Sequence, residues 1–155
     1  MDRVLKFLKA NRIMTLATSC DDVPRASIME YTMVGDTMMF STYPGSIKSR
    51  NLSKNPRISL TVGHIPVFLA IDGTATEAGQ KEQEEYIRAQ LEIRWHNFRG
   101  EKPKYVEDWN RIMMERYPEF KNKMESGGMR YYKVTFETAY YAEGVWPPRV
   151  IKMGK

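Results

Sequence analysis

The sequence predicts a single α+β domain, mainly β, in which an antiparallel sheet of six to seven strands closes as a barrel. Three observations predict it. Short segments of alternating polar and apolar residues fill much of residues 13–77, with one helix among them. The spacing becomes helical after Gly79 and alternates again from Met129. A chain of 155 residues can form one hydrophobic core but not two, so we expect one domain over residues 1–155.

The first predicted element is an N-terminal helix. Asp2 is a suitable N-cap and Asn11 a suitable C-terminal residue, with apolar residues at helical spacing between them. Charged residues interrupt these apolar positions, which is unlike a secretory signal. The one cysteine, Cys20, cannot form an internal disulfide and fits a reducing compartment. We therefore expect a cytoplasmic protein.

Alternating segments predict the strands, and turn-forming residues mark the connections between them. A hairpin turn is expected at 34–36, and Asn55-Pro56 should end a short helix that begins near Ser46. The predicted strands are 13–19, 25–32, 37–42, 57–62, 67–77, 129–137 and 139–144.

A two-helix insert is expected at about 80–126. Apolar residues recur at helical spacing over 81–99 and again over 104–125. The tryptophans of this insert, Trp95 and Trp109, are expected to pack against the barrel.

The strand predicted at 25–32 has no wholly apolar face. Alternation places Arg25, Ser27, Met29 and Tyr31 on one side of it. A cation and a hydroxyl beside Met suit a wall that meets a ligand with a charged end and a flat apolar body. An edge strand with one solvated face is the alternative.

Residues 41–57 form a basic segment without an acidic residue. A helix that begins near Ser46 directs its free N–H groups and the positive end of its dipole at the preceding loop, where a phosphate would be stabilised. Lys48 lies in the first turn and is expected to contribute more than Lys54 in the last. A solvated basic helix that only connects two strands is the alternative. The cations of the segment are Lys48, Arg50, Lys54 and Arg57.

Several function classes lack support. The net charge is +5, but no basic stripe interleaved with aromatic residues indicates a nucleic-acid surface. No apolar run is long enough for a membrane span. His64 and His96 have no metal-ligand partner at useful spacing, so no metal site is expected. No motif identifies a catalytic acid, base or nucleophile.

Three segments together carry a family resemblance. Residues 24–27 read Pro-Arg-Ala-Ser, residues 40–48 read Phe-Ser-Thr-Tyr-Pro-Gly-Ser-Ile-Lys, and residues 55–60 read Asn-Pro-Arg-Ile-Ser-Leu. This ordered set resembles the pyridoxamine 5′-phosphate oxidase-like, FMN-binding split-barrel family. The likeness covers residues 13–77 best and leaves the helical insert unexplained. It implies a split barrel, a homodimer and FMN at the interface between protomers.

The resemblance also assigns site residues. It places the strand Arg25–Met29 along the flavin and its ribityl chain, with Arg25 reaching toward the phosphate. Ile47 stands where the oxidase proper has a second cation, and Arg50 one turn later would compensate. The positions that the resemblance assigns to the cofactor are Arg25, Ala26, Ser27, Ile28, Met29, Ser41, Thr42, Ser46, Lys48 and Arg50.

Two departures from the oxidase proper affect the function. Glu30 stands where the oxidase has a lysine, and the tail lacks its Arg-x-His motif. Vitamin B6 oxidation is therefore not expected, and the chain is more similar to the small stress-protein-like members. We expect an FMN-binding protein that is a flavin-dependent oxidoreductase of unknown substrate. A non-catalytic binding protein for a flavin, a deazaflavin or haem is the alternative, and an interaction protein with an empty barrel is a third reading.

The tail after Gly144 contains Trp146, two prolines and Arg149. Because prolines end sheet pairing, this tail is expected to leave the barrel as an extended arm. Such an arm could bring Trp146 and Arg149 to the partner's flavin. The alternative is that Trp146 covers its own barrel.

Overall fold

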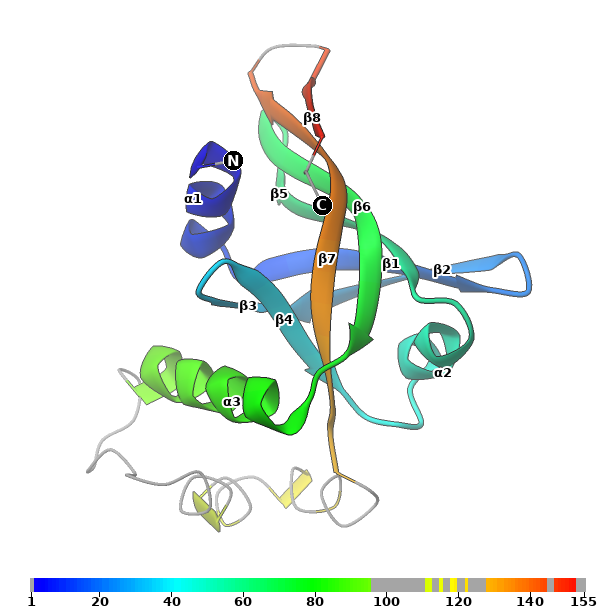
Figure 1. Cartoon of the computed structure of the whole chain (residues 1–155), viewed down its shortest axis with the longest axis vertical. Coiled ribbons are helices and arrows are strands. Elements are labelled where there is room, and N and C mark those ends of the chain that lie inside the picture. The colour runs from blue at the N-terminus through cyan, green and yellow to red at the C-terminus, as the bar shows by residue number, and fades with distance from the viewer. Residues whose placement is uncertain are drawn as a thin grey trace.

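The computed structural model describes residues 2–95, 111–112, 115, 118–119, 122, 128–144 and 147–152. The described strands form one antiparallel sheet that curls into a half-barrel, and the helices α1, α2 and α3 lie around it (Figure 1). The elements are α1 (Asp2–Ala10), β1 (Ile13–Cys20), β2 (Val23–Glu30), β3 (Thr32–Val34), β4 (Thr37–Thr42), α2 (Ile47–Lys54), β5 (Arg57–His64), β6 (Val67–Glu77), α3 (Gln80–Trp95), β7 (Arg130–Glu143) and β8 (Arg149–Lys152).

The strands follow the order β2-β1-β5-β6-β7-β4-β3, and β8 pairs with β7 beside this path. Every pair is antiparallel. The seven strands of the path and their curvature confirm the predicted α+β barrel class. None of the helices in the described part of the chain is long and apolar enough to cross a membrane.

The core lies on the concave side of the sheet, where alternate residues of each strand point inward. Met14 and Leu16 of β1 are buried, whereas the alternate residues Ile13 and Thr15 are exposed. Phe40 of β4 belongs to the same buried cluster. The predicted strand faces therefore correspond to the inner and outer faces of the barrel.

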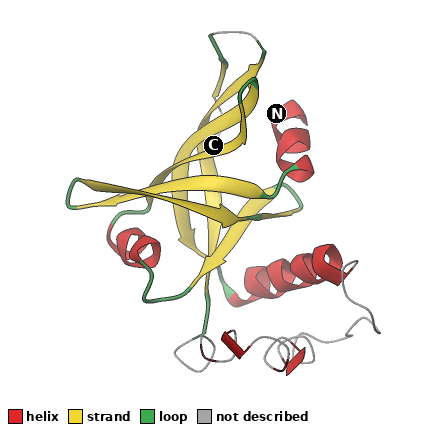
Figure 2. Cartoon of the chain, turned by 180° about the vertical axis from the view of Figure 1, so that it is seen from behind, coloured by secondary structure: helices red, strands yellow, loops and turns green. Residues whose placement is uncertain are grey.

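The helices lie around this sheet, as the view from behind shows (Figure 2). α1 contributes Val4 and Leu8 to the core. α3 packs on the outer side of β4, where Tyr86 joins Met39 in a smaller buried cluster. α2 lies near the β1–β2 hairpin, against β1.

Two predicted segments, the second strand and the tail, differ from the structure. The strand expected over 25–32 ends at Glu30, because Tyr31 turns inward and its hydroxyl donates to the Leu8 carbonyl at 2.9 Å. Thr32 then begins the separate strand β3. The tail does not leave the sheet as an arm, because residues 149–152 pair with β7 as β8.

The two closing strands expected over 129–137 and 139–144 are one strand, β7. The register shifts opposite Asp72 and Gly73, so the strand bends without breaking its ladder. A Cβ on Gly73 would lie 2.1 Å from the Thr135 carbonyl oxygen, which explains the glycine at this close approach. Most of the second insert helix predicted over 104–125 lies outside the described residues.

Candidate functional site

A cavity of about 440 Å³ opens between the β1–β2 hairpin and the outward side of α2. Its lining combines cations, an acid, a thiol and two exposed apolar side chains. The lining residues are Cys20, Asp21, Val23, Arg25, Ile47, Arg50, Asn51, Ser53 and Lys54. The basic segment and the second strand of the sequence analysis therefore meet in space.

Two guanidinium groups in this cavity have no counterion within the described part of the chain. Arg25 comes from β2 and Arg50 from α2, and neither forms an ion pair with any residue that the structure describes. Lys54 also lines the cavity, but its Nζ lies 3.7 Å from a carboxylate oxygen of Asp21. The cavity is thus electropositive and can bind an anion with charge-assisted hydrogen bonds.

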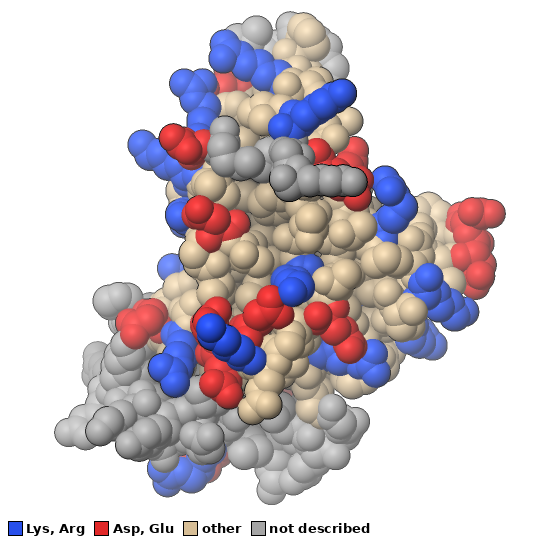
Figure 3. All heavy atoms as spheres, in the orientation of Figure 1, with Lys and Arg blue, Asp and Glu red and all other residues tan. Residues whose placement is uncertain are grey.

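The β1–β2 turn places the acid at the cavity. Asp21 and Asp22 both have positive φ, 51° and 58°, as a two-residue hairpin turn with the twist of its strands requires. Asp tolerates this conformation better than most residues. Figure 3 shows the acidic side chains at the hairpin tip and basic ones next to them, within a surface of mixed charges.

The thiol of Cys20 donates to Asp21 at 3.2 Å. This hydrogen bond, with a smaller contribution from burial, raises the pKa of Cys20. The thiol is therefore protonated at neutral pH, and the structure gives it no catalytic role.

Helix α2 begins as the sequence predicts. Ser46 is the N-cap, and its Oγ accepts a hydrogen bond from the backbone N–H of Ser49 at 3.1 Å. The same Oγ lies 3.0 Å from the Thr42 hydroxyl. Ser46 is thus engaged in local contacts, and neither Ser46 nor Lys48 lines the cavity.

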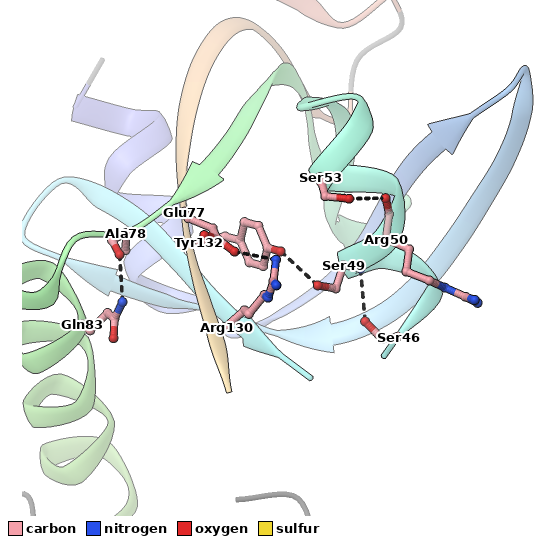
Figure 4. A network of polar contacts seen from close by, with 9 residues as sticks. All are labelled: Ser46, Ser49, Arg50, Ser53, Glu77, Ala78, Gln83, Arg130 and Tyr132. Atoms are coloured by element: carbon pink, nitrogen blue, oxygen red, sulfur yellow. Dashed lines mark hydrogen bonds and ion pairs between the residues drawn. The ribbon is translucent and has the colours of Figure 1, made fainter. Parts of the chain in front are cut away.

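Buried polar contacts attach α2 to the barrel. The hydroxyls of Ser49 and Tyr132 lie 3.1 Å apart, and Asn51 Nδ2 donates to Thr18 Oγ1 at 3.1 Å. Figure 4 shows the Ser49 contact pointing into the barrel and the Arg50 side chain pointing away from it. The inward side of α2 therefore fixes the helix, and its outward side presents cations.

The residues of β2 divide between two faces. Arg25, Ser27 and Met29 share the inner face, opposite the buried side chains of β1. Ala26 and Ile28 lie on the outer face, where Ile28 is 78% exposed. The second strand predicted as a ligand wall is an edge strand that pairs only with β1 among the described strands.

Ser41 and Thr42, predicted to line the flavin, point to opposite sides of β4. Thr42 is buried on the inner side, whereas the Ser41 hydroxyl lies 3.4 Å from that of Tyr86 of α3. Arg149 lines a separate hollow with Arg3 and Glu143, at the other end of the molecule from α2 (Figure 1). Trp146 lies outside the described residues.

Sequence reasoning did not assign Asp21, Asn51 or Lys54 to the site. Lys54 was recognised as part of the basic segment, and its helical spacing from Arg50, one turn away, could have placed it on the same side. Asp21 could be placed at the site only with knowledge of the hairpin turn, and Asn51 only with knowledge of how α2 packs on the barrel.

A second surface is exposed on the convex side of the sheet. α3 covers this side over β3 and β4, and no described helix covers it over β1 and β2. Ile13 and Ile28 are 52% and 78% exposed there. Ile13 and Ile28 lie on adjacent strands, so their exposed side chains are candidates for one apolar contact surface.

Comparisons with known proteins agree with this architecture. A family model described as pyridoxamine 5′-phosphate oxidase matches residues 1–142. No curated protein matches the sequence. The solved structure of general stress protein 26 from Bacillus anthracis str. Sterne is similar, with a TM-score of 0.63, 14% identity, and coverage of 98% of this chain and 97% of that one.

Two further solved structures share the fold. A haem-binding protein from Mycobacterium smegmatis has a TM-score of 0.65 and 15% identity, covering 94% of this chain and 55% of that one. A protein described as F420 reductase has a TM-score of 0.56 and 16% identity, covering 86% of this chain and 93% of that one. At these identities the likeness concerns the fold alone.

Proposed function

We propose that this chain, which belongs to the pyridoxamine 5′-phosphate oxidase family, binds FMN through the cavity between α2 and the β1–β2 hairpin and acts as a flavin-dependent oxidoreductase. One observation carries the proposal: Arg25 and Arg50 line one cavity from two different elements, and neither has a counterion among the described residues. Two guanidinium groups match the charge of a phosphate monoester dianion.

The other residues present fit the rest of the cofactor. β2 is an edge strand, so its free backbone N–H and C=O groups can bind the polar edge of a flavin ring. Ser27 and Met29 share the inner face of β2 with Arg25, which gives one hydroxyl and one apolar side chain on the same side. These three side chains can orient a flat ligand with an anionic end.

Bound FMN would supply hydride and one-electron chemistry, so no protein acid or base is obligatory. The contribution of this chain is therefore to bind the phosphate, orient the ring and exclude water from one ring face. We assign no catalytic residue.

A homodimer belongs to the proposal, with FMN at the interface. The exposed convex face with Ile13 and Ile28 is the surface we assign to the second copy. Burial of these apolar side chains against a second copy would favour association.

A non-catalytic binding protein for a deazaflavin or haem is the second candidate. The name of the haem-binding protein with this fold favours it, whereas the name F420 reductase raises a second cofactor for an enzyme with this fold. An anion site suits each of these ligands, so the cavity does not distinguish them.

The visible absorption spectrum of the purified protein tests the function, followed by titration with FMN and with riboflavin. Flavin absorption, or tighter binding of FMN than of riboflavin, would support the proposal. A Soret band would favour haem. A colourless protein that binds neither flavin would refute it.

A further inference from the structure

We infer that Thr18 and Asn51 are positioning residues whose hydrogen bond sets the spacing between Arg25 and Arg50, and thereby the phosphate affinity of the cavity. The inference rests on the proposed function, because it names what positions that same site. Neither Thr18 nor Asn51 would need to touch the phosphate to act in this way.

A short path through buried groups connects the two guanidinium-bearing elements. Thr18 of β1 is the cross-strand partner of Arg25 of β2. Its Oγ1 accepts from Asn51 Nδ2 at 3.1 Å, and Asn51 precedes Leu52 and follows Arg50 in α2. Thr18 is 3% exposed and Asn51 is 8% exposed, so water does not compete for this contact.

Apolar packing alone does not fix the position of α2. The helix has eight residues, and its only large buried apolar side chain is Leu52. Helices of this length are marginal in isolation, so their placement depends on tertiary contacts. The buried side chains of α2 are otherwise the polar Ser49 and Asn51, and each has a hydrogen-bond partner in the barrel.

These two contacts constrain different movements. Ser49 ties α2 to Tyr132 of β7, on the far side from the hairpin. Asn51 ties it to β1, the strand that carries β2. The C-cap residue Asn55 also donates to Ser19 of β1, so loss of the Asn51 contact releases the middle of α2, next to Arg50, while both ends of the helix keep an anchor.

Loss of the Thr18 hydroxyl would leave an amide N–H of Asn51 buried without a partner, which favours a shift of the helix. Charge-assisted hydrogen bonds to phosphate depend on donor direction as well as distance. A change in the separation of the two guanidinium groups should thus weaken phosphate binding more than binding of the uncharged part of the ligand.

The first test compares FMN with riboflavin, which lacks the phosphate, in Thr18→Val and Thr18→Ser proteins. Thr18→Val keeps the side-chain volume and removes the hydroxyl. We expect its FMN affinity to fall about tenfold, the upper range for one buried hydrogen bond, with riboflavin affinity nearly unchanged. Thr18→Ser should restore the preference for FMN. Thr15→Val, on the exposed face of the same strand, is the matched control.

The second test needs no flavin. Cys20 is the only cysteine of the chain and lines the cavity. Its reaction rate is measured with an anionic aromatic disulfide and with neutral iodoacetamide, with and without inorganic phosphate. In the unchanged protein we expect phosphate to slow the anionic reagent selectively. Thr18→Val should reduce this selective slowing of the anionic reagent several-fold. If the valine variant does not fold, Thr18→Ala is measured in its place.

The outcomes separate the two proposals. Equal loss of FMN and riboflavin affinity in Thr18→Val, or unchanged reagent selectivity, would assign Thr18 a merely structural role and overturn the inference. If the unchanged protein binds neither flavin but Thr18→Val still alters phosphate protection of Cys20, the inference stands and the flavin function fails.

Discussion

The hydroxyl groups of Ser49 and Tyr132 lie 3.1 Å apart, and both side chains are almost completely buried. The Tyr132 ring also stacks on Phe40 with centroids 5.2 Å apart. A polar contact between α2 and β7 is thus enclosed within the apolar core.

Tyr132→Phe should lower the free energy of unfolding by about 1–3 kcal/mol, because it keeps the ring stack and leaves the Ser49 hydroxyl buried without its partner. Urea denaturation measures the change. Tyr140→Phe on the same strand is the control. The double variant with Ser49→Ala completes a mutant cycle. If its loss in free energy of unfolding equalled the sum of the losses in the two single variants, the two hydroxyls would not be coupled.

Arg50→Gln should weaken FMN binding by about 1.5–3 kcal/mol, the range for a hydrogen bond to a charged group. Lys48→Gln should have a smaller effect, because Lys48 does not line the cavity. Fluorescence titration gives both affinities. Arg57→Gln, which removes a cation paired with Glu137, is the control for a general loss of positive charge. Equal losses in all three variants would indicate diffuse electrostatics.

Asp21→Asn should raise FMN affinity about two- to fivefold at low salt, because it removes the carboxylate that pairs with Lys54 and would repel a phosphate in the cavity. The gain should decline as salt is added. Asp22→Asn is the matched control, since Asp22 shares the turn but does not line the cavity. A gain of the same size in both variants would contradict a local effect of Asp21.

Ile28→Lys should shift the protein from dimer to monomer in sedimentation experiments, because a charge would replace an apolar side chain at the proposed interface. Ile65→Lys is the control, as Ile65 is 83% exposed but lies in the turn between β5 and β6. A dimer that tolerates Ile28→Lys would place the interface elsewhere.

Alkaline pH should destabilise the fold. Burial raises the pKa of Tyr31 above its ordinary value of 10.0, so the folded state retains this proton more strongly than the unfolded state. The free energy of unfolding should therefore fall as pH rises above about 10. Burial also raises the pKa of Tyr131, so Tyr31→Phe should reduce this pH dependence without abolishing it. An unchanged slope in denaturation above pH 10 would refute the assignment.

Local chemistry made some features predictable from the sequence. The N-cap at Ser46 depends on residues within one turn, and the inward face of β1 depends on simple alternation. The bend in β7 could not be predicted, because it depends on the approach of Gly73 to Thr135 across the sheet. Pairing of the tail as β8 likewise depends on an available edge of β7.

The candidate site was predictable to a similar extent. The family resemblance assigned Arg25 and Arg50 to the cofactor, with the strand face also supporting Arg25, and both line the cavity. Lys48 was favoured because of its predicted place in the first turn of α2. It does lie in that turn, but on a side of the helix that does not line the cavity. Assignments to the cofactor at Ser41, Thr42 and Arg149 stay predictions. Asn51 required knowledge of what α2 packs against.

The position of β7 also determines when the protein can fold during synthesis. β4 pairs with β3 and β7, and β6 pairs with β5 and β7, so among the described strands only β7 joins the two parts of the sheet. Met38 of β4, for example, pairs with Val134 of β7, which is distant in sequence. Until β7 leaves the ribosome, the nascent chain can form β2-β1-β5-β6 and β3-β4 only as separate units. Sheet closure is therefore a late, non-local step, and chaperones would encounter two unjoined pieces of sheet with exposed edges.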